Sequence, residues 1–80
     1  MKLPRDITGY ELAKALAEFG YNTTRQTGSH LRLTTIQSGE HHISIPAHTP
    51  LKIGTLAAIL SEIESHHKLT RDEILKRLFP

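Results

Sequence analysis

The sequence predicts an α+β fold in which three antiparallel strands are covered on one face by helices. Apolar residues recur at helical spacing near both ends of the chain, at 9–19 and from about 52 onward. Between these ends lie three short segments of strand-like composition, at 21–27, 30–35 and 41–45. A chain of 80 residues is long enough for one domain, so we expect residues 1–80 to fold as a single unit in the order α-β-β-β-α-α.

The first helix has a clear start and a clear end. Residues 8–11 read Thr-Gly-Tyr-Glu, which is a capping box in which a threonine hydroxyl and a glutamate carboxylate accept hydrogen bonds from free backbone amides. Apolar side chains then follow at helical spacing up to Phe19, and Gly20 is suited to a left-handed C-terminal cap. The sequence therefore predicts a helix over 9–19.

Two further helices are predicted in the C-terminal half. The first begins near Lys52, and histidines and a lysine at 66–68 fit its end because positive charge there is favoured by the helix dipole. A second capping box, at 70–73, opens a short helix that ends at 79–80. The expected apolar stripe of the longer helix consists of Ile53, Leu56, Ile59, Leu60 and Ile63.

The strands 30–35 and 41–45 form the best-defined part of the predicted sheet. The loop 37–39 ends in glycine, where a type I turn followed by a bulge requires a left-handed residue. This turn sets a register in which apolar residues face apolar residues on one side of the sheet. The expected pairs on that side are Leu33 with Ile43 and Leu31 with Ile45, and those on the other side are Thr34 with His42, Arg32 with Ser44 and His30 with Pro46. One face is then core and the other is polar and basic, while the polar segment 21–27 is an edge strand.

Composition excludes several classes of site. The chain has no cysteine, which excludes disulfides, thiol catalysis and the common cysteine-containing zinc sites. The net charge of +2 is compatible with a nucleic-acid partner but does not require one. The N-terminal residues lack the apolar run of a signal peptide and no segment is long enough to span a membrane, so we expect a soluble cytoplasmic protein.

His30 is the leading candidate for chemistry. It follows Gly28-Ser29 at the start of a strand, on the polar face, with Arg32 on the same face and Arg25 in the preceding segment. A neutral imidazole can move a proton during phosphodiester cleavage, and guanidinium groups can hold the phosphate. On spacing alone, the competing interpretation is an ordinary exposed histidine of a strand.

The other candidates are less specific. Gly28 removes bulk beside Ser29, which would let a phosphate approach the backbone amides. Ser29 itself lacks the partners of a serine-hydrolase triad. His42 shares the basic face and could contact RNA, whereas His41 points to the opposite side and should cover the sheet edge. A metal site built from His30, His42 and His48 is conceivable, but no carboxylate accompanies them at ligand spacing, so we expect neither metal nor another cofactor.

The segment 25–33, which reads Arg-Gln-Thr-Gly-Ser-His-Leu-Arg-Leu, resembles the central motif of the HicA (YcfA-like) family of messenger-RNA interferase toxins. Gly-Ser-His is the most characteristic element of that motif. The start Lys2-Leu3-Pro4, the end of the first helix at 19–21, and the segments 45–48 and 50–56 also agree with the family. The resemblance therefore extends over nearly the whole chain.

The resemblance implies a double-stranded-RNA-binding-like fold and metal-independent endoribonuclease activity on mRNA. It assigns the catalytic histidine to His30, and Arg25, Gly28, Ser29, Arg32, His42 and His48 then become candidate RNA-binding residues. The implied partner is an antitoxin of the HicB type, with the toxin a monomer when free. The alternative is a non-catalytic RNA-binding module on the same fold, because a fold does not guarantee an activity.

Overall fold

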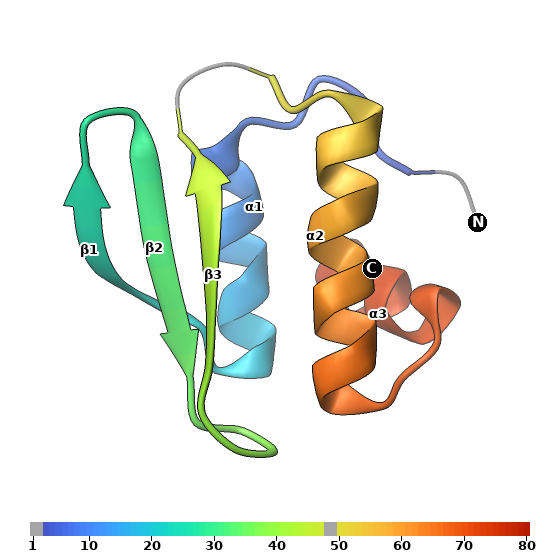
Figure 1. The fold of residues 1–80 in the computed structure, drawn as a ribbon. Coiled ribbons are helices and arrows are strands. Elements are labelled where there is room, and N and C mark those ends of the chain that lie inside the picture. Colours follow the sequence, from blue (N-terminus) through green and yellow to red (C-terminus); the bar gives the residue numbers. More distant parts are fainter. Residues whose placement is uncertain (1–2, 48–49) are drawn as a thin grey trace.

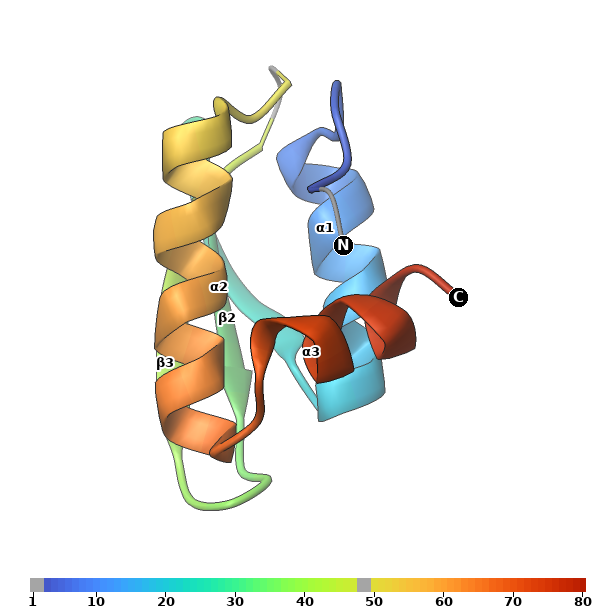
Figure 2. The same ribbon diagram turned by 90° about the vertical axis from the view of Figure 1, so that its right-hand side faces the viewer.

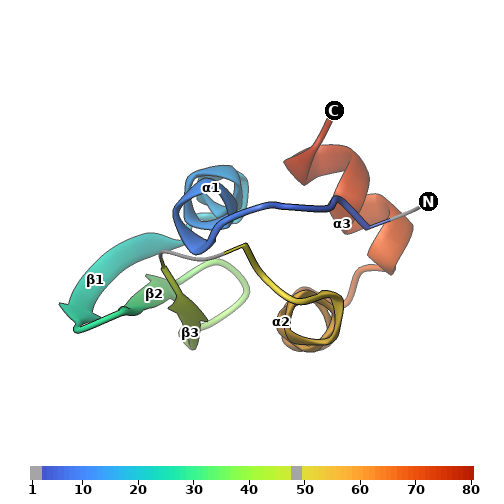
Figure 3. The same cartoon turned by 90° about the horizontal axis from the view of Figure 1, so that it is seen from above.

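A computed structural model of the protein describes residues 3–47 and 50–80. A three-stranded antiparallel sheet in the order β1-β2-β3 is covered by helices on one face only (Figure 1), and the view from above shows the other face open (Figure 3). The α+β prediction and the predicted order of elements are confirmed. The elements are α1 (Gly9–Ala15), the 3-10 turn η1 (Leu16–Phe19), β1 (Asn22–Thr27), β2 (His30–Thr35), β3 (His41–Pro46), α2 (Ile53–His67) and α3 (Arg71–Leu78).

The helix boundaries follow the local signals in the sequence. Both predicted capping boxes are present, with the Thr8 and Thr70 hydroxyls accepting from the amides of Glu11 and Glu73. The first helix tightens to a 3-10 turn in its last residues, and Gly20 ends it in the left-handed conformation with φ of 78°. Each helix therefore begins and ends where its backbone groups find partners.

The predicted register of β2 and β3 is confirmed at every pair. Leu33 lies opposite Ile43 and Leu31 opposite Ile45, so the apolar side chains of both strands point toward the helices. β1 is exposed along its whole length, as expected for a polar edge strand, and a bulge interrupts its pairing with β2 at residue 24.

Two details of the sequence prediction are wrong. In the β2–β3 loop, Ser38 has a φ of 58° and Gly39 one of 101°, whereas a type I turn needs a negative φ at Ser38. The loop nevertheless delivers the predicted register. Ile53 does not join the apolar stripe of α2, since it is 49% exposed. It lies in the first turn of α2, which projects beyond the end of β3 (Figure 1), so the strand does not cover it.

The core is continuous between the sheet and the helices. α3 lies across from α2 to the end of the first helix and closes the side of this core (Figure 2). Arg71 fastens α3 to α2, because its guanidinium donates to the Glu64 carboxylate at 2.8 Å and to the carbonyl of Ala57 at 3.2 Å. No helix in the described part of the chain combines the length and the apolar character that a membrane span requires. The core residues with no exposed area are Leu12, Leu16, Leu33, Ile45, Ala47, Leu56, Leu60, Ile63 and Ile74.

Candidate functional site

The Gly28-Ser29 turn places His30 at the first position of β2. Thr27 pairs with His30, so the turn between β1 and β2 contains only these two residues. Gly28 has a φ of 56° and Ser29 a negative one, which is the φ pattern of a type II′ hairpin turn with glycine at its first position. A Cβ at Gly28 would meet no atom within 4 Å, so the turn borders open space. His30 is therefore presented, exposed, at the edge of an accessible hairpin end.

The sheet register brings His30 and the two candidate arginines onto one open face. Arg25 lies directly opposite Arg32, and His30 lies opposite Thr27 on one side and Pro46 on the other. Residues directly opposite each other in a sheet point to the same side, and successive residues of one side are about 6.7 Å apart along the strand. The bulge at residue 24 is what gives Arg25 this orientation, since it shifts the β1 register by one residue. Sequence reasoning expected Arg25 to be close, and the structure pairs it directly with Arg32.

The arginine pair is unfavourable for the fold itself. Like charges directly opposite each other in a sheet are destabilising. Within residues 3–47 and 50–80, neither Arg25 nor Arg32 forms an ion pair with a carboxylate, and both are exposed. The pair therefore offers two cationic, hydrogen-bonding groups to an anion from outside, such as a phosphate.

His42 occupies the far end of the same face. Its Nδ1 lies 2.7 Å from the Thr34 hydroxyl oxygen, and its Nε2 lies 2.8 Å from a carboxylate oxygen of Glu40. His42 is opposite Thr34, four positions along β2 from His30, which corresponds to about 13 Å along the sheet. The two imidazoles are therefore on one face but too far apart to act on the same phosphate. His48, the remaining candidate, lies outside the described residues.

The end of β3 is held tightly behind His30. The Ala47 amide donates to the carbonyl of Ser29 at 2.7 Å, which extends the β2–β3 pairing beyond Pro46. Gly9 at the start of α1 is pressed against the same backbone, because a Cβ there would lie 1.8 Å from the carbonyl oxygen of Pro46. The position of His30 is thus fixed by the hairpin turn, by β3 and, through β3, by α1.

Comparison of the sequence with models of known protein families identifies a family. The model of the family described as the HicA toxin of bacterial toxin–antitoxin systems matches residues 9–65. The chain belongs to the HicA toxin family. No curated protein matches the chain significantly, and no solved structure does so either.

The HicA family match covers the whole sheet, α1 and most of α2, and thus includes His30 and the arginine pair. It is shorter than the near-full-length resemblance expected from the sequence, since residues 66–80, with α3, lie outside it. Membership in a toxin–antitoxin family implies that this HicA protein has an antitoxin partner.

A second histidine group, on the helix side of the sheet, was not anticipated. The Tyr21 hydroxyl lies 2.7 Å from Nδ1 of His41 and 3.2 Å from Nε2 of His67, and the rings of His41 and His66 stack at 4.4 Å. His66 also donates through Nε2 to the carbonyls of Gln37 and Gly39, both at 3.0 Å. The helix-dipole interpretation of residues 66–68 is therefore incomplete, and His41 does more than cover an edge.

This group, His41, His66 and His67 with Tyr21, is called the histidine cluster below. Burial and the neighbouring His66 lower the pKa of both His41 and His67, and burial with the charge of Glu62 raises the pKa of Tyr21 to about 12. Among the described residues, no three histidine or acidic side chains are arranged as a metal site. The cluster is thus a hydrogen-bonded and stacked joint between α2 and the sheet.

Proposed function

We propose that this HicA family member is a metal-independent endoribonuclease that cleaves mRNA and uses His30 as its catalytic residue. The observation that supports this most directly is the open face: an exposed imidazole stands one row from two arginines that no carboxylate in the described chain neutralises. Such a toxin acts in the cytoplasm, where its substrate is found.

The chemistry follows from the groups on this face. The 2′-hydroxyl of the RNA attacks the adjacent phosphorus, the bond to the 5′-oxygen breaks, and a 2′,3′-cyclic phosphate forms. His30 takes the proton from the attacking hydroxyl or gives one to the leaving 5′-oxygen, and solvent water completes the other of these two proton transfers. Arg25 and Arg32 bind the phosphate oxygens and stabilise the charge that grows on them. Gly28 leaves room for the phosphate to approach the backbone beside Ser29. His42 is a more distant RNA contact, and His48 is a further candidate for RNA binding.

The test is His30→Ala compared with His42→Ala. His30 is exposed and contributes no core volume, so the change in unfolding free energy should stay within about 0.5 kcal/mol. Cleavage at saturating RNA should fall by at least about 10²-fold, since a positioned proton-transfer group is worth about 10²–10⁴ in rate. His42→Ala should weaken RNA binding but retain cleavage at saturation, because His42 lies about 13 Å from His30. A folded His30→Ala protein that cleaves at the wild-type rate would remove His30 from the mechanism.

A non-catalytic RNA-binding module is the second candidate. The same exposed arginines favour it, because they could bind phosphates without any chemistry. Such a module would bind RNA equally well with His30 or alanine and would release no fragments. Cleavage by the wild-type protein that disappears in His30→Ala excludes it.

We further propose that the antitoxin is of the HicB type, that it is acidic, and that it covers the open face of a toxin that is monomeric when free. The basic face carries the arginine pair, so an acidic partner is complementary to it. RNA and antitoxin should then exclude each other in a competition assay. NMR shifts on antitoxin binding should include Arg32 and His42, and a complex that blocks cleavage without perturbing either residue would place inhibition elsewhere.

A further inference from the structure

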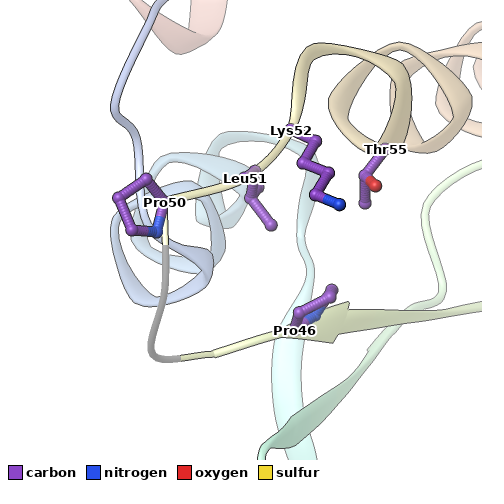
Figure 4. Close-up of a pocket in the computed structure, with 5 residues that line it drawn as sticks. All are labelled: Pro46, Pro50, Leu51, Lys52 and Thr55. Carbon is purple, nitrogen blue, oxygen red and sulfur yellow. The ribbon is translucent and has the colours of Figure 1, made fainter.

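A pocket of about 250 Å³ opens between the end of β3 and the start of α2 (Figure 4). Five side chains converge on it, and the ammonium end of Lys52 points into it between Leu51 and Thr55. The lining residues are Pro46, Pro50, Leu51, Lys52 and Thr55. The pocket borders the open face at Pro46, which lines it and is the residue directly opposite His30.

The walls of the pocket are held in place by the same contacts that fix His30. The Ala47 amide donates to the carbonyl of Ser29 at 2.7 Å, next to Pro46. On the other side, the Leu51 amide donates to the carbonyl of Ile7 at 2.7 Å. A ligand in the pocket would therefore lie at a fixed position relative to His30, since Pro46 forms part of the pocket wall and pairs with His30.

The chemistry of the lining fits a flat, partly polar ligand. Pro46, Pro50 and Leu51 provide apolar surface, while Lys52 and Thr55 provide a cation and a hydroxyl. Neither polar side chain hydrogen-bonds within the described residues, so both can serve a ligand. Pockets for drug-sized ligands run from about 300 to 1,000 Å³. A volume of 250 Å³ lies below that range and suits a single base.

We infer that this pocket binds the nucleobase adjacent to the cleaved phosphate and so sets the sequence preference of cleavage. The inference rests on the proposed ribonuclease function. The base lies against the prolines and Leu51, and Thr55 and Lys52 contact its polar edge. A site that hydrogen-bonds a substrate discriminates against analogues that cannot make the bond.

The first experiment maps cleavage sites in a random-sequence RNA pool for the wild-type protein and for Thr55→Val. Valine keeps the shape of threonine but loses the hydroxyl, so the preference for the base next to the cut should weaken by about threefold to tenfold. Total cleavage should persist, because Thr55 takes no part in proton transfer. The matched control is Thr23→Val, on the exposed edge strand opposite Leu33 and on the helix side of the sheet. Identical cleavage patterns for wild type and Thr55→Val would overturn the inference.

The second experiment does not depend on cleavage. The His30→Ala protein is titrated with each of the nucleoside 3′-monophosphates and, separately, with inorganic phosphate, while the amide signals of Leu51 and Thr55 are followed by NMR. Nucleotides should shift both signals beyond the effect of phosphate, and one base should do so more strongly than the others. Shifts that phosphate alone reproduces would mean an anion site and not a base site. If the wild-type protein cut no RNA, the proposed function would fail, but this titration would still show whether the pocket binds a nucleobase.

Discussion

Gly9→Ala should destabilise the protein strongly, although alanine is a better helix former than glycine. An added Cβ would lie 1.8 Å from the carbonyl oxygen of Pro46, 2.7 Å from its carbon and 2.8 Å from the Cα of Ala47. Real Cβ contacts essentially never fall below 3.0 Å, and all three atoms belong to backbone that cannot rotate away. α1 and the end of β3 must therefore separate by more than 1 Å, since the shortest contact has to grow from 1.8 Å to at least 3.0 Å.

The expected cost of Gly9→Ala is about 3 kcal/mol, the upper end of the usual range for overpacking. For a domain of this size, that corresponds to a melting temperature lowered by about 12–24 °C. Gly54→Ala is the matched control, because Gly54 also lies in the first turn of a helix but an added Cβ there meets nothing within 4 Å. Alanine at Gly54 should stabilise the protein by about 0.5–1 kcal/mol.

Thermal melting of the two variants beside the wild type is the assay. The two alanines should move the melting temperature in opposite directions. A Gly9→Ala protein that melts at or above the wild-type temperature would refute the close approach of α1 to Pro46. Because the same backbone fixes His30, the folded fraction of Gly9→Ala should also show altered cleavage, whereas Gly54→Ala should not.

Three other outcomes are expected. Leu33→Ala should lower the unfolding free energy by about 2–5 kcal/mol in urea titrations, because Leu33 has no exposed area and its loss opens a cavity; a smaller change would show that the core collapses around it. Arg32→Ala should raise the Kd for RNA without lowering the melting temperature, as it removes one of two opposed like charges; unchanged binding would place the phosphate elsewhere. RNA cleavage should persist in excess EDTA and leave a 2′,3′-cyclic phosphate or its hydrolysis product; activity lost on chelation and restored by a divalent ion would contradict the metal-independent mechanism.

The sheet could be predicted from the sequence because its information is local. Alternation in 30–35 and 41–45, together with a short loop, permits only one register that buries Leu31 and Leu33 together with their partners. The helix starts were predictable for the same reason, since a capping box is complete within four residues. The candidate site followed from these elements, as His30 and Arg32 alternate with buried leucines. The turn conformation at Ser38 was missed because nothing in its identity demands a positive φ.

What could not be predicted depends on contacts between distant parts of the chain. Gly9 looks like an ordinary helix residue until Pro46 is placed against it. The pocket joins the end of β3 to the start of α2, and one of its ends is tied to Ile7 at the N-terminal side of the chain. One contact that the sequence analysis missed, between Glu40 and His42, did have a local signal. The two residues lie two positions apart near the start of one strand, where their side chains can share a face.

The histidine cluster depends on residues from three separate segments, and it makes stability sensitive to acid. The Tyr21 hydroxyl can donate a proton to only one of His41 and His67, and the imidazole that accepts this hydrogen bond must be unprotonated at the accepting nitrogen. Besides burial and His66, Glu62 raises the pKa of His41 and His42 lowers it, whereas His41 and Arg77 both lower the pKa of His67. The net direction is downward for both histidines.

A histidine whose folded pKa lies below its usual value of 6.5 binds fewer protons in the folded state than in the unfolded state. The stability that His41 and His67 contribute is therefore complete above pH 6.5 and is lost as the pH falls through 6.5 toward their lowered values. The pKa values of the capping glutamates are lowered from 4.5 by the threonine caps, so their contribution to stability is lost only in stronger acid. The pH range of this loss is therefore separate from that of the histidines. Urea unfolding should show that the free energy of unfolding falls progressively between about pH 7.5 and about pH 5.5. His67→Gln keeps a hydrogen-bonding group for Tyr21 but cannot titrate, so it should make this pH dependence shallower. His30→Ala, outside the cluster, should leave the slope unchanged. A wild-type stability that stays constant or rises over this interval would show that the cluster tolerates protonation and would contradict this prediction.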